Sequence, residues 1–302
     1  MSDFERDLAE HRPAILRHCY RMTGAFAEAE DRTQETMERA WRARASFGGR
    51  STLLRWLYAI ATNVCLNGIA RKKRSLPHLV QGPAAPDERL ERTEHERWIT
   101  PAPDDRLFPD EALESKETVA LAFVALLQRV PPRQRAALIM KDVLGWSADE
   151  IAQSLELTTS AVNSALFRAR QTVTREDGPH HEPAPETVRA FVQAWMERDL
   201  DALVALLKDD VTLAMPPYAA WFEGVASVER FLASRSFTAF WEQVTTVAST
   251  RANGRPAFGY FREDDRAGAY ALMVTRFDAD RVAEMVVFVE GDRFPAFEFF
   301  SP

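Results

Sequence analysis

The clearest pattern of apolar and polar positions lies in residues 132–171, where two helical stretches are separated by a very short break. Ile151 and Leu155 lie on one face of the first stretch, and Val162 and Leu166 form the apolar stripe of the second. Two short helices joined by a tight turn fit a helix-turn-helix. This motif places its second helix in the major groove of DNA.

Polar residues suited to helix N-caps precede both of these predicted helices. Ser147, followed by Glu150 three residues later, is a capping-box signal, and Thr158 and Thr159 supply hydroxyl caps for the second helix. An ordinary helical hairpin would share this pattern, but the outward face favours DNA, because its small polar groups, aromatic ring and cations suit base edges, thymine methyls and phosphates. That face consists of Ser160, Asn163, Ser164, Phe167, Arg168 and Arg170.

Residues 3 to about 73 also follow a helical period throughout. Gly24 interrupts the first helix, and a second runs from about Glu28 to Ala45. FGGR at 47–50 predicts a turn, since glycines there can take positive φ. A third helix follows, capped by Ser51 or Thr52 and ending in a basic tetrapeptide. The pattern therefore predicts an all-α domain.

The pattern changes beyond residue 175. Residues 176–185 are rich in proline and lack a hydrophobic run, so they read as a linker. In residues 186–302, helical stretches come first and are followed by the β-like runs TTVAST, RPAFGYFR, GAYALMVTRFD and RVAEMVVFVE. Helices followed by a curled antiparallel sheet predict an α+β cone.

Charge is segregated along the chain, although its net value of −7 looks wrong for a DNA-binding protein. The net charge is +5 in residues 1–75, −6 in 76–127, +3 in 128–175 and −9 in 176–302. Two basic blocks are thus separated by an acidic segment and followed by an acidic domain. A nucleic-acid module with an appended partner has this distribution.

The cysteines and the hydropathy pattern bound the compartment. Cys19 and Cys65 lie in helical patterns without metal-binding or redox spacing, so we expect buried, reduced thiols and a cytoplasmic protein. The charged N-terminus and the lack of a run of about 18 apolar residues give no sign of a signal peptide or membrane span. No cofactor or metal is expected, and a monomer is the default.

Two motifs together resemble one family. Residues 29–74, AEDRTQETMERAWRARASFGGRSTLLRWLYAIATNVCLNGIARKKR, closely resemble the second conserved region of bacterial RNA polymerase sigma factors of the extracytoplasmic-function (ECF) class. VPPRQRAALIMKDVLGWS with the following helix-turn-helix resembles the fourth region of that class. The resemblance implies a region 2 helical bundle over 1–75, an acidic, Pro-rich linker over 76–110 and region 4 over 111–175.

The resemblance implies a non-enzymatic sigma factor that binds core polymerase at its clamp and flap regions and directs promoter recognition at the −10 and −35 elements. A ligand-responsive helix-turn-helix regulator with a sensory C-terminal domain is the alternative, but it leaves the region 2 motif unexplained. Core binding is expected on the exposed face of the second helix, for which a merely solvated acidic face is the other interpretation. Its residues are Asp31, Gln34, Glu35 and Glu38.

For the −10 element, the resemblance points to Phe47 for packing, Asn63 for reading an unpaired base and Ala43 as a small wall residue. Trp56 is read as core rather than as a stacking platform. Cations near these residues would meet phosphates, which gives salt-dependent affinity without sequence information. They are Arg55, Arg71, Lys72, Lys73 and Arg74.

For the −35 element, the resemblance places four residues in reading positions: Lys141, Asn163, Ser164 and Phe167. It places four others near the DNA backbone: Thr159, Ser160, Arg168 and Arg170. Asn163 stands where an arginine often reads guanine in this family, whereas asparagine pairs best with adenine. We therefore expect a promoter preference that differs from that of the usual members.

The linker has two interpretations. Its prolines and acids favour a disordered tether. Alternatively, acids including Asp87, Glu88, Glu91, Asp104 and Asp105 let it pass through the polymerase channel that later holds nascent RNA, by mimicking the charge of RNA. In that case Trp98 and Ile99 could anchor it.

The C-terminal domain resembles the polyketide-cyclase-like (SnoaL) branch of the NTF2-like superfamily, through its element order and a predicted turn at residues 221–224. All six histidines precede residue 182, which excludes a histidine-based catalytic centre in this domain. We expect it to regulate in cis, through contacts of the acidic domain with the basic sigma regions. Several aromatic residues could line a pocket for an unknown small-molecule ligand, or form a packed core: Trp195, Tyr218, Trp221, Phe222 and Tyr260.

Overall fold

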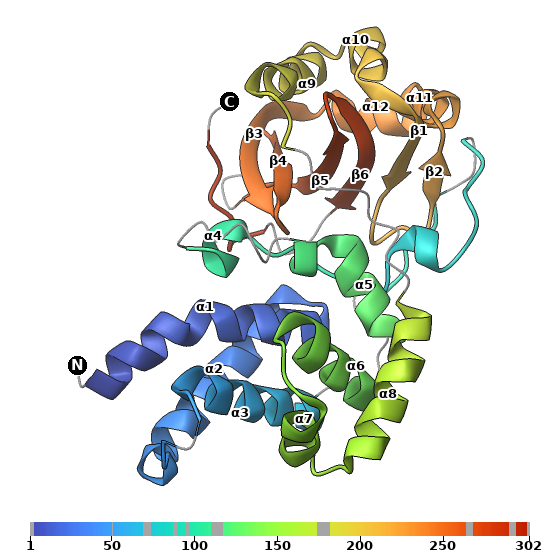
Figure 1. The fold of residues 1–302 in the computed structure, drawn as a ribbon. Helices are drawn as coiled ribbons and strands as arrows, with labels where there is room; N and C mark the ends of the chain where they lie inside the picture. The colour runs from blue at the N-terminus through green and yellow to red at the C-terminus, as the bar shows by residue number, and fades with distance from the viewer. Residues whose placement is uncertain are drawn as a thin grey trace. The chain divides into compact units, whose positions relative to one another are not determined.

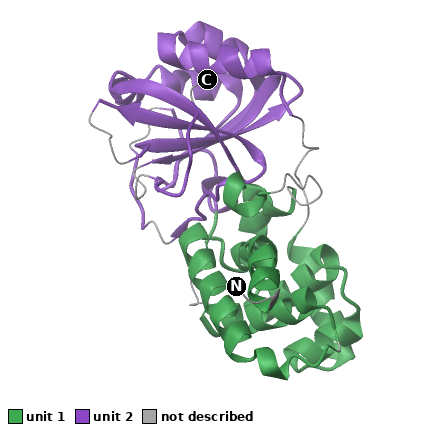
Figure 2. Ribbon diagram, turned by 90° about the vertical axis from the view of Figure 1, so that its left-hand side faces the viewer, with its two compact units in different colours: residues 1–75, 104–176 green, residues 76–103, 177–302 purple. Residues whose placement is uncertain are grey.

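The structure is a computed structural model, and it describes residues 3–49, 51–68, 74–86, 90–94, 97–109, 117–173, 182–263, 268–289 and 294–300. The chain forms two compact units, which Figure 2 shows in different colours. Unit 1 comprises residues 1–75 and 104–176, and unit 2 comprises residues 76–103 and 177–302. Each unit therefore contains two separate stretches of the chain.

The first stretch of unit 1 is an all-α bundle, as its helical period predicts. Its elements are α1 (Asp3–Thr23), α2 (Phe26–Arg42), the 3-10 turn η1 (Arg44–Ser46) and α3 (Leu53–Gly68). Leu16, Ala40 and Ala61 are fully buried where the three helices meet. Cys19 and Cys65 are free thiols buried in the same core.

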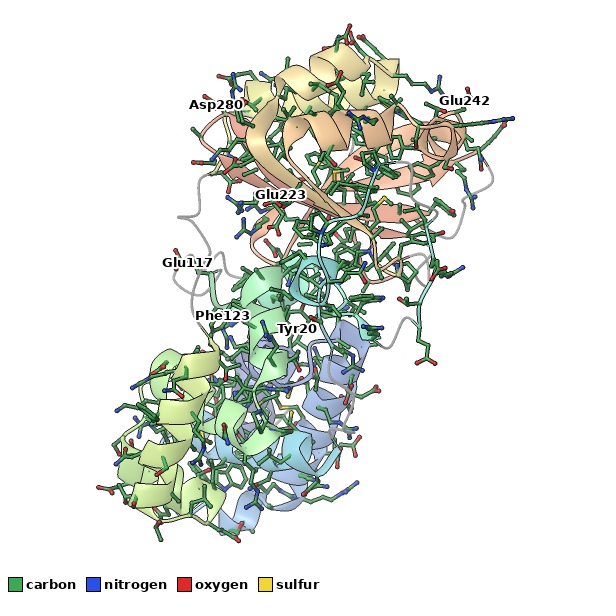
Figure 3. All side chains as sticks on the ribbon, turned by 90° about the vertical axis from the view of Figure 1, so that its right-hand side faces the viewer. Tyr20, Glu117, Phe123, Glu223, Glu242 and Asp280 are labelled. Carbon is green, nitrogen blue, oxygen red and sulfur yellow. The ribbon has the colours of Figure 1, made fainter. Side chains whose placement is uncertain are left out.

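The second stretch of unit 1 is also helical. Its elements are α4 (Asp104–Leu107), α5 (Leu121–Arg129), α6 (Pro132–Leu138), the π-helical turn η5 (Ile139–Val143), α7 (Ala148–Leu155) and α8 (Thr159–Thr172). Tyr20 of α1 and Phe123 of α5 are both buried in unit 1 (Figure 3). Gly24 has φ +71°, and a Cβ there would lie 2.9 Å from the Gln128 side chain, so glycine allows α5 to pack beside the end of α1.

Unit 2 is the predicted α+β cone. The helices α9 (Pro185–Glu197), α10 (Leu200–Ala205), α11 (Val225–Leu232) and α12 (Arg235–Trp241) lie against a curved sheet (Figure 1). Its strands are β1 (Leu207–Ala214), β2 (Trp221–Glu223), β3 (Val244–Ala252), β4 (Arg255–Arg262), β5 (Ala271–Asp278) and β6 (Arg281–Val289). The strand order is β2-β1-β6-β5-β4-β3, in which only β1 and β6 pair in parallel among the described strands.

The core of unit 2 lies between the helices and the sheet. It is rich in aromatic rings, with Phe191 and Trp195 of α9 packed against Phe258 and Tyr260 of β4. Burial raises the pKa of the Tyr260 phenol well above its ordinary value. Residues 221–223, which the sequence predicts as part of a turn, instead pair with β1 as the edge strand β2.

Residues 76–103, here called the inter-region segment, lie in the linker for which the sequence left two interpretations open, a disordered tether and an acidic mimic of RNA. This segment packs on unit 2, with the 3-10 turn η2 (Pro77–Leu79) near its start. Leu76, Ile99 and Ala102 are fully buried, and Trp98 is 2% exposed. Apolar residues scattered among its prolines and acids are buried against the domain, which composition alone does not indicate.

No helix in the part of the chain that the structure describes is long and apolar enough to cross a membrane.

Candidate nucleic-acid interface

The helix-turn-helix has the predicted caps at Ser147 and Thr158 but not at Thr159. The Ser147 hydroxyl accepts a hydrogen bond from the Glu150 amide at 3.2 Å, and the Glu150 carboxylate accepts one from the Ser147 amide at 2.7 Å. α7 ends at Glu156, whose φ is +54°. Thr158 caps α8 by accepting from the Ala161 amide at 3.2 Å. Thr159 instead donates to Asp149 at 2.7 Å, so its hydroxyl ties α8 to α7.

α8 has one buried and one exposed face. Val162, Leu166 and Ala169 are buried against the other helices, whereas Phe167 is 65% exposed. Phe167 thus leaves a large aromatic side chain in solvent, on the face that the sequence predicts to meet DNA. The other predicted −35 residues that are exposed around it are Thr159, Ser160, Asn163, Ser164, Arg168 and Arg170, while Lys141 is half-buried.

Arg170 is exposed but already paired. Its guanidinium donates to both oxygens of Asp142, at 2.5 and 3.1 Å, and this hydrogen-bonded carboxylate raises the pKa of Arg170. A bidentate pair fixes the planar guanidinium in one orientation. Arg170 therefore meets a DNA phosphate only by sharing or leaving Asp142, whereas Arg168 lies exposed on the same helix.

The predicted core-polymerase face of α2 is only partly available. Asp31 and Gln34 are exposed, but Glu35 pairs with Arg32 at 3.1 Å and with Arg39 at 2.6 Å. Glu38 pairs with Arg42 at 3.3 Å and accepts a hydrogen bond from Gln34 at 3.3 Å. Ion pairs at these helical spacings are worth only tenths of a kcal/mol, about 0.3 to 0.5. A partner can displace them at little cost.

Two of the predicted −10 residues, Phe47 and Asn63, are linked to one side of α3 through Trp56. Phe47 follows η1 and lies against Trp56, with ring centroids 5.2 Å apart. Trp56 is half-buried rather than part of the core, and Asn63 is exposed two turns later on α3. Because a spacing of seven residues returns to the same helix face, Asn63 and Trp56 face the same side. Ala43, at the end of α2, is half-buried.

Among the predicted phosphate-binding cations, the two that the structure describes, Arg55 and Arg74, have different partners within the protein. Arg55 forms an ion pair with Glu150 at the start of α7, and its guanidinium lies 5.6 Å from the Trp146 ring centroid. Arg74 donates to the Thr23 carbonyl at 2.8 Å and pairs with Glu28 at 2.9 Å. Arg74 therefore holds the end of α1 in place. Arg71, Lys72 and Lys73 lie outside the described residues.

A buried polar junction joins the two stretches of unit 1, and sequence reasoning missed it. Arg135 of α6 is 3% exposed and donates to the carbonyls of Met22, Gln128 and Val130 and to the Gln128 side chain. Gln128 in turn donates to the Arg21 carbonyl at 3.0 Å. Burial lowers the pKa of Arg135 to about 10.

Two more side chains of α1 are buried nearby, of which Arg21 bonds across to the second stretch and His18 bonds within the first. Arg21 donates to the Thr118 carbonyl at 3.1 Å, and burial lowers its pKa to about 10. His18 is fully buried, with its Nε2 2.9 Å from the Thr62 hydroxyl, and burial, followed by the charge of Arg21, lowers its pKa to about 3. Arginines at helical spacing look like surface residues in a sequence, so no local signal marks these contacts.

Unit 2 contains a half-open cavity of about 550 Å³. Of the five aromatic residues predicted for a pocket, Tyr218 lines it, whereas Trp195, Phe222 and Tyr260 lie in the packed core. Trp221 instead donates its indole N–H to the Gln81 carbonyl at 2.8 Å. Described residues that line the cavity are Leu90, Met215, Tyr218, Phe231, Ser236, Phe237, Phe240, Tyr270, Val287 and Val289.

Backbone and indole hydrogen bonds fix the inter-region segment on unit 2. The Pro217 carbonyl accepts from the Thr93 amide at 3.0 Å and from the Trp98 indole at 3.2 Å. Farther along, the Ala102 backbone amide donates to the Asn253 side-chain carbonyl at 2.9 Å, and the Asn253 backbone amide donates to the Ala102 carbonyl at 3.0 Å. These bonds satisfy polar groups that burial removes from water.

Three family models match the chain: Sigma-70 region 2 over residues 8–75, Sigma-70 region 4 over 120–173 and the SnoaL-like domain over 188–291. The ECF RNA polymerase sigma factor SigG of Mycobacterium tuberculosis is 38% identical over 309 residues, which cover 98% of this chain and 83% of that relative. The ECF sigma factor SigE of Mycolicibacterium smegmatis is 30% identical over 175 residues, covering 57% of this chain and 60% of SigE.

The fold has a counterpart among solved structures. The crystal structure of the ECF sigma factor SigJ of Mycobacterium tuberculosis matches 99% of both chains with a TM-score of 0.61 at 22% identity. A helical bundle, a helix-turn-helix and an α+β cone in this order define a promoter-recognition factor with an appended SnoaL-like domain. The chain belongs to the ECF sigma factors of RNA polymerase, which direct promoter recognition and transcription initiation.

Proposed function

We propose that this sigma factor reads the −35 element with the exposed face of α8 and the −10 element with the Phe47, Trp56 and Asn63 surface. Exposure of Phe167 and Asn163 on a helix whose opposite face is buried supports the first assignment. The alignment of Trp56 and Asn63 on one side of α3 supports the second. A regulator with only a helix-turn-helix would have no use for this second surface.

We further propose that α2 contacts the polymerase clamp and that region 4 contacts the flap. Asp31 and Gln34 are exposed on α2, and the ion pairs of Glu35 and Glu38 are weak enough to be replaced by intermolecular ones. Co-purification of core polymerase with Asp31→Ala and Gln34→Ala variants tests the clamp contact. Glu5→Ala, an exchange at a half-buried position of α1, is the control for a general effect of acid removal.

The SnoaL-like domain regulates in cis through the inter-region segment. The observation that carries this proposal is Trp98, a residue between the two sigma regions that is 2% exposed and hydrogen-bonded to Pro217 of unit 2. A segment that is fixed on a folded domain has fewer conformations than a free tether, so the distance between the chain ends that it joins is restricted. Domain and segment together limit how the two sigma regions can separate.

Trp98→Ser tests this restraint, because it removes the indole and leaves the charge unchanged. Transcription from a cognate promoter by the full-length variant with core polymerase is expected to rise at limiting sigma factor concentration. Glu94→Ser, an exchange at an exposed position of the same segment, is the matched control and should leave transcription unchanged. Equal transcription by Trp98→Ser and the parent chain, with the segment shown by proteolysis to be released, would contradict the proposal.

We propose that the SnoaL-like domain binds rather than catalyses. The described residues that line its cavity are apolar, aromatic or hydroxyl-bearing, which suits ligand contact rather than proton transfer near neutral pH.

A further inference from the structure

The cavity of unit 2 is built from two parts of the chain that lie far apart in sequence. Phe237 and Phe240 of α12, Tyr218 and Tyr270 form aromatic walls within the domain. Leu90 completes the lining, and it belongs to the inter-region segment. A molecule bound in this cavity would therefore touch the connection between the two sigma regions directly.

The chemistry of the cavity limits what it can hold. A volume of about 550 Å³ lies within the range of small-molecule sites, which is roughly 300 to 1,000 Å³. The described lining residues are uncharged, and Arg262 stacks on the Tyr270 ring, 3.6 Å from its centroid, without being part of the lining. A charged ligand would therefore lose hydration without gaining a charged partner in the lining itself. Hydroxyl groups of Tyr218, Tyr270 and Ser236 provide a few polar contacts. A neutral, largely apolar molecule with one or two hydrogen-bonding groups fits this lining.

The wall of the cavity and the attachment of the segment share one loop. Tyr218 lines the cavity, and its backbone forms an isolated antiparallel β-bridge with Arg92 of the segment. The preceding residue, Pro217, offers the carbonyl that accepts from the Thr93 amide and the Trp98 indole. A ligand that packs against Tyr218 and Leu90 would thus steady both sides of the contact that holds the segment.

We propose that the cavity binds a neutral, largely apolar small molecule and that its occupancy tightens the hold of the domain on residues 90–94 and 97–99. The regulatory consequence rests on the proposed function of the segment, whereas the binding site and its coupling to the segment do not. A ligand gains its contact with Leu90 only when the segment is attached to the domain, so its binding free energy is more favourable in that state. Ligand and attached segment therefore stabilise one another by the same amount.

The binding step is tested on the full-length protein with 1-aminoanthracene, a neutral aromatic amine whose fluorescence rises in apolar surroundings. Saturable binding to a single site is expected. Ser236→Trp places an indole in the cavity and should weaken binding by about tenfold or more. Ala239→Trp adds the same side chain to an exposed position of α12 outside the lining and should bind as the parent does. Unsaturable binding, or equal losses in both variants, would overturn the site.

The coupling step is tested by hydrogen exchange with and without 1-aminoanthracene. Saturating probe is expected to slow exchange of the Thr93 amide by about threefold or more, because that amide opens only when the segment leaves Pro217. Leu90→Ala shortens a half-buried side chain of the segment that packs against the domain core, and it should reduce both probe affinity and this protection. Probe binding that Ser236→Trp blocks, with exchange at Thr93 unchanged, would overturn the coupling.

These measurements need no polymerase, so their failure differs from failure of the proposed function. If Trp98→Ser leaves transcription unchanged while the probe binds and protects Thr93, the site and its coupling stand and the regulatory role of the segment falls. If Trp98→Ser raises transcription while the probe does not bind, the inference about the cavity falls and the cis regulation stands.

Discussion

Arg135 shows at the scale of one residue how unit 1 is held together. Its guanidinium bonds to carbonyls from α1, α5 and the turn before α6, so one side chain satisfies acceptors in both stretches of the unit. Arg135→Met keeps much of the volume and leaves these buried acceptors without a partner. We expect the free energy of unfolding to fall by about 3 kcal/mol. Urea unfolding measures it, with exposed Arg133→Met as the control.

His18 predicts how the stability of unit 1 depends on pH. Burial, together with the charge of Arg21, lowers its pKa to about 3 in the folded state, compared with 6.5 for the ordinary group. Between these values the unfolded chain binds a proton that the folded chain does not, so stability falls as the pH decreases below 6.5. From pH 6.5 to 5 the expected loss is about 1.6 kcal/mol.

The measurement for His18 is thermal or urea unfolding at several pH values. His18→Gln keeps a side-chain partner for the Thr62 hydroxyl, and it should flatten the pH dependence over this range. His11→Gln, at a half-buried position of the same helix, should retain it. A parent protein whose stability is constant from pH 6.5 to 5 would contradict a buried neutral histidine.

Burial that follows from local helical period could be predicted from the sequence, whereas contacts between distant parts of the chain could not. Helical period alone separates buried Val162 from exposed Phe167, because both belong to one short helix. Arg135 bonds to Met22, 113 positions away, and nothing in its neighbourhood distinguishes it from exposed Arg133. The predicted pocket residues divide in the same way: Tyr218 lines the cavity, whereas Trp195, Phe222 and Tyr260 lie in the packed core. Which of these two places an aromatic ring occupies depends on contacts between distant parts of the chain.

At the scale of elements, α8 allows a sharp test of promoter preference. Asn163 is exposed, so Asn163→Ala should leave the fold unchanged while removing an amide that can pair with adenine. Selection of −35 sequences from a random pool is expected to lose discrimination at one position, by about 1 to 3 kcal/mol. Gln153→Ala, exposed on α7, is the matched exchange on the preceding helix. A guanine-dependent element that is indifferent to Asn163→Ala would contradict this reading.

The inter-region segment shows what composition can and cannot predict. Its described part is mostly without regular helix or strand, and its prolines and acids are typical of such a segment. They do not predict burial, because Trp98 and Ile99 need partners such as Pro217 that follow more than a hundred residues later. Alternation and turn signals likewise find the four strands β3 to β6, but the edge strand β2 exists only through its pairing with β1.

At the scale of the molecule, unit 1 brings groups from the two DNA-binding regions into contact with one another. Arg55, a predicted phosphate contact of region 2, pairs with Glu150 and lies over Trp146, both from region 4. A carboxylate and a DNA phosphate compete for the same guanidinium. If Arg55 contacts a DNA phosphate as predicted, we expect this pair to compete with that contact.

Glu150→Gln tests this competition without disturbing the helix start, because glutamine also serves in a capping box. The variant removes the negative charge facing Arg55, and both side chains are about 40% exposed, so the gain is limited to about 1 kcal/mol. We expect promoter affinity of the polymerase complex to rise by up to about fivefold at low salt and by less at high salt. Glu156→Gln, which removes an exposed charge at the end of α7, controls for the general effect of a less acidic region 4. Equal gains in both variants would assign the effect to net charge, whereas a gain confined to Glu150→Gln identifies its pair with Arg55 as a contact that promoter DNA has to replace.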